Sequence, residues 1–219
     1  MRTDRRRPRG SSEVDRRSWA TTYERTPYQE LPWFDPEPSP EVVRAVEEGF
    51  LPARSPVLDV GCGAGSNLLY LARKGLEAHG IDLSPGAVAA ARKRAEELRL
   101  PIDAQVGDAL ALEFPEGRFA GMVDIGCFHT LPIRRRPEYA REAARALRPG
   151  GSFVLSWVAR ESTQVHGPPH RPSLGEVVAT FEGLFLFVRT GFSAAAEEGH
   201  LSTYVAWLRR RAVPQPPPR

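Results

Sequence analysis

The residues of this chain that could do chemistry gather around one glycine-rich stretch. Gly61, Gly63 and Gly65 follow the apolar run VLDV and precede a segment with helical character that starts at Ser66. Glycine has no Cβ atom, so it allows a tight turn and a close approach of the backbone to a ligand. A helix that begins behind such a turn offers unpaired N–H groups to a phosphate or carboxylate. The stretch predicts a strand–turn–helix unit of the nucleotide-binding kind, although its G-x-G-x-G spacing differs from the G-x-G-x-x-G fingerprint.

Aspartates accompany the strands predicted around this turn. Asp59 lies inside VLDV, where a buried carboxylate needs a partner such as a ligand ammonium group or the turn amides. Asp82 follows the predicted strand Glu77–Ile81, a position suited to accept hydrogen bonds from ribose hydroxyls. Asp108 follows the predicted strand Ile102–Val106, where it could receive an adenine amino group. In open α/β sheets ligands bind beyond the carboxyl ends of the strands, so these side chains predict one site.

The motifs D-V-G-C-G-A-G, G-I-D-L-S, G-D-A and L-R-P-G-G-S-F-V-L follow one another between Val57 and Trp157. In this order they resemble the class I S-adenosylmethionine-dependent methyltransferases. The resemblance implies S-adenosyl-L-methionine as the cofactor and an α/β fold, a Rossmann-like doubly wound sheet of about seven strands. That sheet would be mostly parallel, with a C-terminal antiparallel hairpin and helices on both faces. The competing interpretation is an unrelated α/β domain with glycine-rich turns. The residues that the resemblance assigns to the cofactor are Trp33, Asp59, Gly61, Gly63, Gly65, Asp82, Leu83, Ser84, Asp108, Ala109, Asp124 and Ile125.

A narrower resemblance involves the end of the fourth predicted strand, Phe119–Ile125. The segment D-I-G-C-F-H-T-L, together with P-W-F-D near Trp33 and the late A-W-L-R-R, is similar to small bacterial enzymes related to thiopurine, thiol, halide and tellurite methyltransferases. The similarity implies that Trp33 lies against the cofactor or acceptor and that Cys127–His129 flanks the transferred methyl group. The segment departs from the D/N-P-P-Y/F pattern of enzymes that methylate amino groups in nucleic acids, which argues against a base as acceptor.

His129, Cys127 and Trp33 are the candidate catalytic residues. His129 is the candidate general base for an acceptor that must lose a proton, and the alternative is a half-buried histidine bonded to a backbone carbonyl. Cys127 is more often a small buried hydrophobe than a nucleophile. In-line displacement at a sulfonium carbon mainly requires alignment and a dry site, and a thiolate needs no strong base. We therefore predict methyl transfer to a small soft nucleophile such as a thiol or sulfide.

Alternatives to this function remain open at the level of the sequence. One is a small-molecule N- or O-methyltransferase of a biosynthetic pathway, and another is a non-catalytic protein that binds S-adenosylmethionine. The Arg134–Arg136 run could hold an anionic acceptor or could be a solvated start of a helix. No metal site is predicted, because His166 and His170 lack a nearby acid or cysteine. Their loop is expected to cover the acceptor pocket.

Charge and cysteine content limit the partners and the compartment. Residues 1–17 hold seven Arg and three acidic residues, which gives this segment a charge of +4. The net charge of the whole chain is +3, so the remaining residues together carry −1. No nucleic-acid partner is therefore expected, although an RNA methyltransferase that uses the basic arm is a further alternative. Cys62 and Cys127 form no disulfide framework, and no apolar leader or membrane-length run occurs. These features predict a cytoplasmic enzyme without membrane contact, either monomer or homodimer.

The elements that must position these residues form one core, for which 219 residues are sufficient. The expected regions are a disordered Arg-rich arm over 1–18, an aromatic lid with the first helix over 19–52, the cofactor-binding core over 53–211 and a loose Pro-rich tail over 212–219. The aromatic side chains between Trp19 and Phe34 either fold over the cofactor or fill an edge of the core. Further helices are predicted over Ser39–Gly49, Ser66–Lys74, Ser84–Arg99, Pro137–Leu147 and Ser173–Phe181, and further strands over Ser152–Val158, Leu184–Arg189 and Leu201–Leu208.

Overall fold

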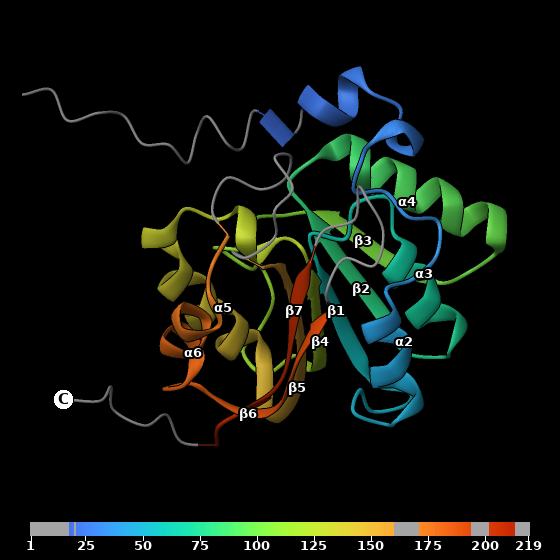
Figure 1. The fold of residues 1–219 in the computed structure, drawn as a ribbon. Coiled ribbons are helices and arrows are strands. Elements are labelled where there is room, and N and C mark those ends of the chain that lie inside the picture. Colours follow the sequence, from blue (N-terminus) through green and yellow to red (C-terminus); the bar gives the residue numbers. More distant parts are fainter. Residues whose placement is uncertain (1–17, 20, 160–170, 194–201, 213–219) are drawn as a thin grey trace, which may run out of the picture.

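A computed structural model describes residues 18–19, 21–159, 171–193 and 202–212. Within these ranges seven strands form one sheet in the order β3-β2-β1-β4-β5-β7-β6, with helices on both faces (Figure 1). Strand β7 runs antiparallel to β5 and β6, and the other strands share one direction. The predicted Rossmann-like sheet with a C-terminal antiparallel pair is therefore confirmed.

The bounds of the elements are as follows. The strands are β1 (Pro56–Val60), β2 (Glu77–Asp82), β3 (Ile102–Val106), β4 (Phe119–Ile125), β5 (Leu147–Val158), β6 (Phe185–Ser193) and β7 (Thr203–Arg210). The helices are α2 (Pro40–Glu47), α3 (Ser66–Arg73), α4 (Pro85–Leu98), α5 (Arg136–Ala146) and α6 (Leu174–Phe181). Short 3₁₀ turns occupy Tyr28–Glu30, Phe128–Thr130 and Ile133–Arg135, and residues 18–19 and 21–25 are helical.

Serine caps explain why three helices begin where the sequence predicts. The side chains of Ser39, Ser84 and Ser173 each accept a hydrogen bond from a backbone N–H in the first turn of the helix that follows. Pro40 and Pro85 occupy the first helical positions of α2 and α4, where proline costs no hydrogen bond. Local chemistry thus sets these starts.

The last strands differ from prediction in their extent. Strand β5 begins at Leu147 rather than Ser152, because Leu147 pairs with Phe119 beyond a register shift in β4. Strand β6 continues past Arg189 as far as Ser193, because β7 offers it partners along that whole length. The predicted connection over 194–201 lies outside the described residues.

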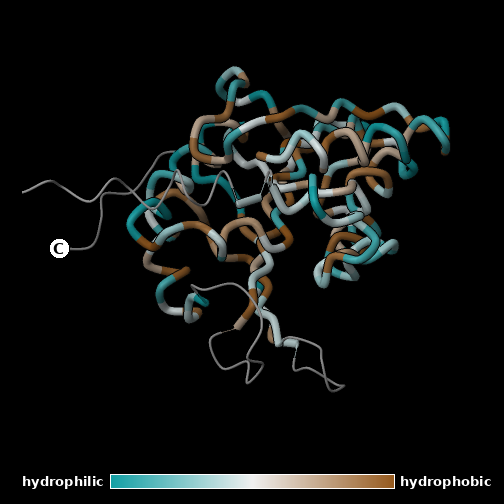
Figure 2. The backbone as a smooth tube through the Cα atoms, turned by 90° about the horizontal axis from the view of Figure 1, so that it is seen from above, coloured by the Kyte–Doolittle hydropathy of each residue, from teal (hydrophilic) through white to brown (hydrophobic). Residues whose placement is uncertain are grey.

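Two apolar layers cover the two faces of the sheet. One layer gathers large aromatic side chains beneath α5 and α6, among them Phe128, Tyr139 and Phe181, all at most 1% exposed. The other layer packs α2, α3 and α4 against β1 and β2 through Leu68, Leu71 and further apolar side chains. In Figure 2 the hydrophobic stretches run through the middle of the molecule and hydrophilic stretches mark its outer turns. The two layers cover the faces of the sheet, so a ligand is expected at the carboxyl ends of the strands.

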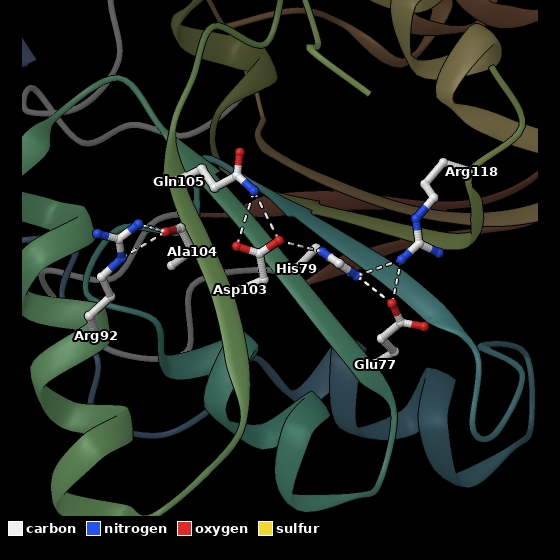
Figure 3. A network of polar contacts seen from close by, with 7 residues as sticks. All are labelled: Glu77, His79, Arg92, Asp103, Ala104, Gln105 and Arg118. Carbon is white, nitrogen blue, oxygen red and sulfur yellow. Dashed lines mark hydrogen bonds and ion pairs between the residues drawn. The ribbon is translucent and has the colours of Figure 1, made fainter. Parts of the chain in front are cut away.

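A polar network joins β2 and β3 at their amino ends (Figure 3). His79 Nδ1 lies 3.1 Å from Asp103 Oδ2, and His79 Nε2 lies 2.9 Å from Glu77 Oε1. The guanidinium of Arg92 donates to the carbonyl of Ala104 at 2.9 and 2.6 Å and so ties α4 to β3. The network lies at the edge of the sheet opposite the glycine-rich turn, and its contacts are structural.

Candidate cofactor and methyl-transfer site

The glycine-rich turn has a backbone that only glycine adopts readily. Gly61, Gly63 and Gly65 have φ values of 70°, 54° and 86°, all in the left-handed region. A Cβ atom at Gly61 would lie 2.6 Å from Cβ of Cys127, so the approach of the loop after β4 also excludes a larger residue. The N–H of Gly61 donates to the carbonyl of Ile81 at 2.8 Å. The turn is therefore fixed against β2, and Cys127 packs against it from the loop after β4.

Asp82 links this turn to the start of α4. Its Oδ2 accepts a hydrogen bond from the N–H of Gly63 at 3.0 Å, and its Oδ1 accepts from the N–H of Ser84 at 2.9 Å. Burial raises the pKa of the Asp82 carboxyl group. Ser84 in turn caps α4, and Leu83 lies between the two. The predicted ribose acceptor thus stands at the end of β2 and also positions both neighbouring loops.

Asp59 is a buried carboxylate with an unsatisfied oxygen. It lies in β1 and is 2% exposed, and its Oδ2 has no hydrogen-bond partner. Burial, together with the charges of Asp124 and Asp82, raises the pKa of Asp59 to about 8. A buried polar atom without a partner is costly. A cationic ligand group bound above the turn would supply that partner, so Asp59 fits the ammonium group of the predicted cofactor.

Asp124 holds the loop after β4 in place. Its Oδ1 accepts from the N–H of Cys127 at 2.8 Å, and its Oδ2 accepts from the N–H of Phe128 at 3.0 Å and from the hydroxyl of Tyr139 at 2.5 Å. Burial raises the pKa of Asp124 to about 6 despite these bonds. Both oxygens accept hydrogen bonds within the protein, so Asp124 positions this loop, and its contact with the cofactor stays a prediction. Ile125, the last residue of β4, leads into this loop.

The structure does not support His129 as a general base. Its Nδ1 accepts a hydrogen bond from the N–H of Val158 at 3.0 Å, so in the neutral ring the hydrogen lies on Nε2. Burial and the charges of Arg136 and Arg171 lower the pKa of His129 to about 3. The expected partner, a backbone carbonyl, is replaced by a backbone N–H. In this geometry His129 is a neutral hydrogen-bond donor.

Cys127 is likewise placed as a packing residue. Its side chain lies against Gly61, and burial raises the pKa of its thiol well above the ordinary value. A thiol held in its protonated form is a poor nucleophile. The structure therefore does not support Cys127 as a reacting group.

Tyr23 brings the aromatic N-terminal segment onto the glycine-rich turn. Its hydroxyl lies 3.1 Å from the place where a Cβ atom on Gly63 would stand, and its own Cβ is equally close to such an atom on Gly86 at the start of α4. Burial is the main cause that raises the pKa of Tyr23 to about 12, and the nearby charge of Asp82 adds to it. Only the clustering of aromatic residues in the sequence pointed toward this contact.

Trp33 contacts Tyr23, and its predicted contact with the cofactor or acceptor stays a prediction. It is 50% exposed, and its Nε1 donates to the Tyr23 hydroxyl at 3.2 Å. Its ring meets that of Trp19 edge-on, with centroids 5.2 Å apart. The segment thus lies over the turn and beside the start of α4 (Figure 1), with Tyr23 innermost.

Asp108 and Ala109 follow β3 at the same edge of the sheet. Oδ1 of Asp108 accepts from the N–H of Leu110 at 2.9 Å, and Ala109 is buried. The predicted adenine-side residues are therefore neighbours of the predicted ribose acceptor across the β2–β3 pair. Among the described residues no group of three or more side chains could hold a metal ion. The His166–His170 loop lies outside the described residues.

Comparison with known proteins agrees with this geometry. Residues 57–151 match the family described as "Methyltransferase domain". The 2-heptyl-1-hydroxyquinolin-4(1H)-one methyltransferase of Mycobacteroides abscessus is 31% identical over 155 residues, which cover 68% of this chain and 67% of that protein. The 2-methyl-6-phytyl-1,4-hydroquinone methyltransferase of Synechocystis sp. is 38% identical over 120 residues, or 52% of this chain and only 36% of that protein.

Solved structures agree in fold over more of the chain. The structure titled "Conversion of a Disulfide Bond into a Thioacetal Group during Echinomycin Biosynthesis" superposes with a TM-score of 0.77 and 25% identity, over 89% of this chain and 91% of that one. The Burkholderia thailandensis 1,6-didemethyltoxoflavin-N1-methyltransferase, solved with its substrate and S-adenosylhomocysteine, gives a TM-score of 0.72 at 19% identity, over 96% and 93%. The chain belongs to the class I S-adenosylmethionine-dependent methyltransferases.

The residues present fit the cofactor of this family. The unsatisfied oxygen of Asp59 suits an ammonium group, and the glycines of the turn have no Cβ atoms that would hold a ligand away from the backbone. Asp82 lies where hydroxyl donors can reach a carboxylate. When bound, S-adenosylmethionine supplies a methyl group on a positively charged sulfur. The protein's part is to hold and align that ligand in a site from which water is excluded.

No described helix has the length and apolar character needed to cross a membrane. The narrower resemblance to thiol and halide methyltransferases stays a prediction, because the relatives named above carry other acceptors in their names.

Proposed function

We propose that this enzyme transfers the methyl group of S-adenosylmethionine, by in-line displacement, to a small organic molecule whose nucleophilic atom ionises without help from the protein. The observation that carries the proposal is the hydrogen bonding and protonation of the side chains in the loop that follows β4. His129 uses Nδ1 to accept an N–H, the Cys127 thiol stays protonated, and both oxygens of Asp124 are engaged. Among the described residues this loop therefore offers no general base.

An acceptor that is already anionic suits such a site. A thiol or sulfide is the acceptor class predicted from the sequence, because a thiol is already partly ionised near neutral pH and the thiolate is strongly nucleophilic. An acidic hydroxyl on an aromatic ring is a second candidate. It is favoured by the relative that is named for a 1-hydroxyquinolin-4(1H)-one, a ring system that carries a hydroxyl group.

The test is the pH dependence of kcat/KM for a series of acceptors with different pKa values. We expect the rate to rise with pH and to level off at the pKa of each acceptor, so the inflection moves along the series. A fixed inflection for all acceptors would show that a group of the enzyme removes the proton. Each thiol is compared with an aromatic hydroxyl of similar pKa, so that the preferred atom is read at equal ionisation.

Two other outcomes separate the alternatives. Preference for an amine over every thiol and hydroxyl would overturn the proposal and leave an N-methyltransferase. Tight binding of S-adenosylhomocysteine without turnover of any acceptor would instead indicate a non-catalytic binding protein.

A further inference from the structure

A pocket rich in arginine lies at the edge of the sheet opposite the cofactor. It has a volume of about 190 Å³ and is lined by Arg141, Arg145, Arg210, Arg211, Glu116, Ala144 and Leu184. Its arginines come from the second half of α5 and from the end of β7, where β5 and β6 begin. The glycine-rich turn lies at the carboxyl ends of the parallel strands, so the two sites are separated by the length of the sheet.

Backbone carbonyls hold three of these arginines in place. Arg145 donates to the carbonyls of Phe114 and Leu112 at 2.7 and 2.6 Å. Arg210 donates to the carbonyl of Leu147, and Arg211 donates to that of Glu182 at 2.9 Å. A carbonyl fixes the orientation of a guanidinium group without neutralising its charge. The pocket is therefore preorganised and keeps its positive potential.

The carboxylates nearby do not balance this charge. Glu142 pairs with Arg145 at 2.9 Å, whereas Glu116 meets Arg210 at 3.4 Å and has a side chain that is 72% exposed. Arg141 reaches no carboxylate among the described residues. Counting Glu142 with the lining residues, four cations face two carboxylates, which leaves an excess of two positive charges.

The partly buried arginines are the two that have carboxylate partners, whereas the excess charge falls on Arg141, which is exposed, and on Arg211, which is half-buried. The side chain of Arg210 is only 17% exposed and that of Arg145 is 33% exposed. Guanidinium groups stay charged in proteins, so this cluster cannot relieve its repulsion by losing a proton. A bound anion would relieve it, and the planar N–H fork of arginine matches the oxygens of a phosphate group.

We propose that this pocket binds a small phosphate-bearing anion, either inorganic phosphate or the phosphate group of a small monoester. The volume of the pocket limits the size of the ligand. Pockets for drug-sized ligands have volumes from about 300 to 1,000 Å³, and this pocket is smaller. The apolar side chains of Ala144 and Leu184 give room beside the arginines for the few carbon atoms of a monoester.

The experiment compares the melting temperature of the full chain in sodium phosphate and in sodium chloride at equal ionic strength, with calorimetry to measure the affinity. A ligand that binds only the native state raises its stability. We expect millimolar phosphate to stabilise the protein beyond chloride. Glycerol phosphate is the second arm, and a stronger effect than that of inorganic phosphate identifies the monoester as the ligand. An equal effect of phosphate and chloride would overturn the proposal.

The variants Arg141→Gln and Arg211→Gln, made together, locate the site. Phosphate affinity should fall at least about tenfold, the size expected from losing a charged hydrogen-bond donor. The ligand-free double variant should stay folded, and any loss of stability from the missing bond between Arg211 and the carbonyl of Glu182 should be equal in chloride and in phosphate. This separates a binding role from a merely structural one. The matched control is Arg73→Gln, an exposed arginine on α3 at the other face of the sheet.

Saturation with S-adenosylhomocysteine distinguishes this pocket from the cofactor site. Phosphate should still stabilise the saturated protein, and the outcome does not depend on which acceptor is methylated. Loss of the phosphate effect under saturation would place the anion at the cofactor edge and overturn the proposal. An unchanged effect in the double variant, or an equal loss in Arg73→Gln, would do the same.

Discussion

At the scale of single residues, a buried carboxylate that suits a cationic ligand lowers the stability of the ligand-free protein when it ionises. Asp59 in the ligand-free protein has its pKa raised to about 8, far above the ordinary value of about 3.9. The folded state therefore holds a proton that the unfolded state has lost between these two pH values. The free energy of unfolding should fall as pH rises through this window, and the loss should be complete above about pH 8.

Asp59→Asn tests this interpretation. The ligand-free variant should melt higher than the parent at pH 8, because the amide cannot ionise in the buried site, and the difference should vanish near pH 4. The same variant should bind S-adenosylhomocysteine more weakly by at least about tenfold, because it lacks the charge that pairs with the ammonium group. Melting curves and calorimetry measure the two effects. Weaker binding together with lower stability at every pH would mean that Asp59 is only a structural residue.

Asp82 should behave differently, because its carboxylate already has partners in the protein. Asp82→Ala should weaken cofactor binding by about 1.5–3 kcal/mol, the usual effect of removing a charged acceptor. It should also lower the melting temperature, since the N–H groups of Gly63 and Ser84 lose their acceptor. Asp82→Asn is the matched control for stability, because it retains one acceptor oxygen. Unchanged affinity in a folded Asp82→Ala variant would remove Asp82 from the site.

At the scale of elements, Arg94 of α4 connects the N-terminal segment to the glycine-rich turn. Its Nη1 donates to the carbonyl of Ala64 at 2.7 Å, and its Nη2 lies 3.4 Å from the carbonyl of Pro36. Its guanidinium also lies over the ring of Phe34, 5.3 Å from the centroid. The side chain of Arg94 thus contacts both the glycine-rich turn and the N-terminal segment that brings Tyr23 to this turn.

We therefore expect Arg94→Gln to loosen the aromatic segment. Amide hydrogen exchange over residues 21–34 should become faster, and the KM for S-adenosylmethionine should rise about tenfold or more while the fold persists. The control is Lys93→Gln, an exposed neighbour that undergoes the same change in charge. Bound cofactor and acceptor should slow exchange over this segment in the parent protein, as predicted for a lid. Exchange that ligands leave unchanged would identify a fixed cap.

At the scale of the whole molecule, ligand binding should stabilise the entire sheet. The residues around the cofactor site come from β1, β2, β3 and β4 and from the N-terminal segment. S-adenosylhomocysteine at a hundredfold excess over its Kd should add about 2.7 kcal/mol to the free energy of unfolding. Thermal unfolding measures this gain, and Asp59→Asn at the same ligand concentration serves as the control. No shift at millimolar ligand would contradict the identification of the cofactor site.

The sequence alone determined the order of the elements along the chain and the edge of the sheet at which we expect the cofactor to bind. The periodicity of hydrophobic residues, serine caps and glycine-rich turns are local features. They can be recognised from residues that are neighbours in the sequence, such as Ser84 and Pro85 at the start of α4. The placement of Asp59 and Asp82 followed from the same rule, because the carboxyl ends of parallel strands meet at one edge.

Only the tertiary structure decided which chemistry the remaining residues can do. Tyr23 reaches Gly63, and His129 accepts the N–H of Val158, across gaps in sequence that no local pattern bridges. Such contacts depend on the packing of whole elements, and the pKa of a buried group depends on how much water that packing removes. Histidine is a residue type that can act as a base. In this fold, however, burial lowers the pKa of His129 and the N–H of Val158 occupies Nδ1, so the ring is a hydrogen-bond donor at Nε2.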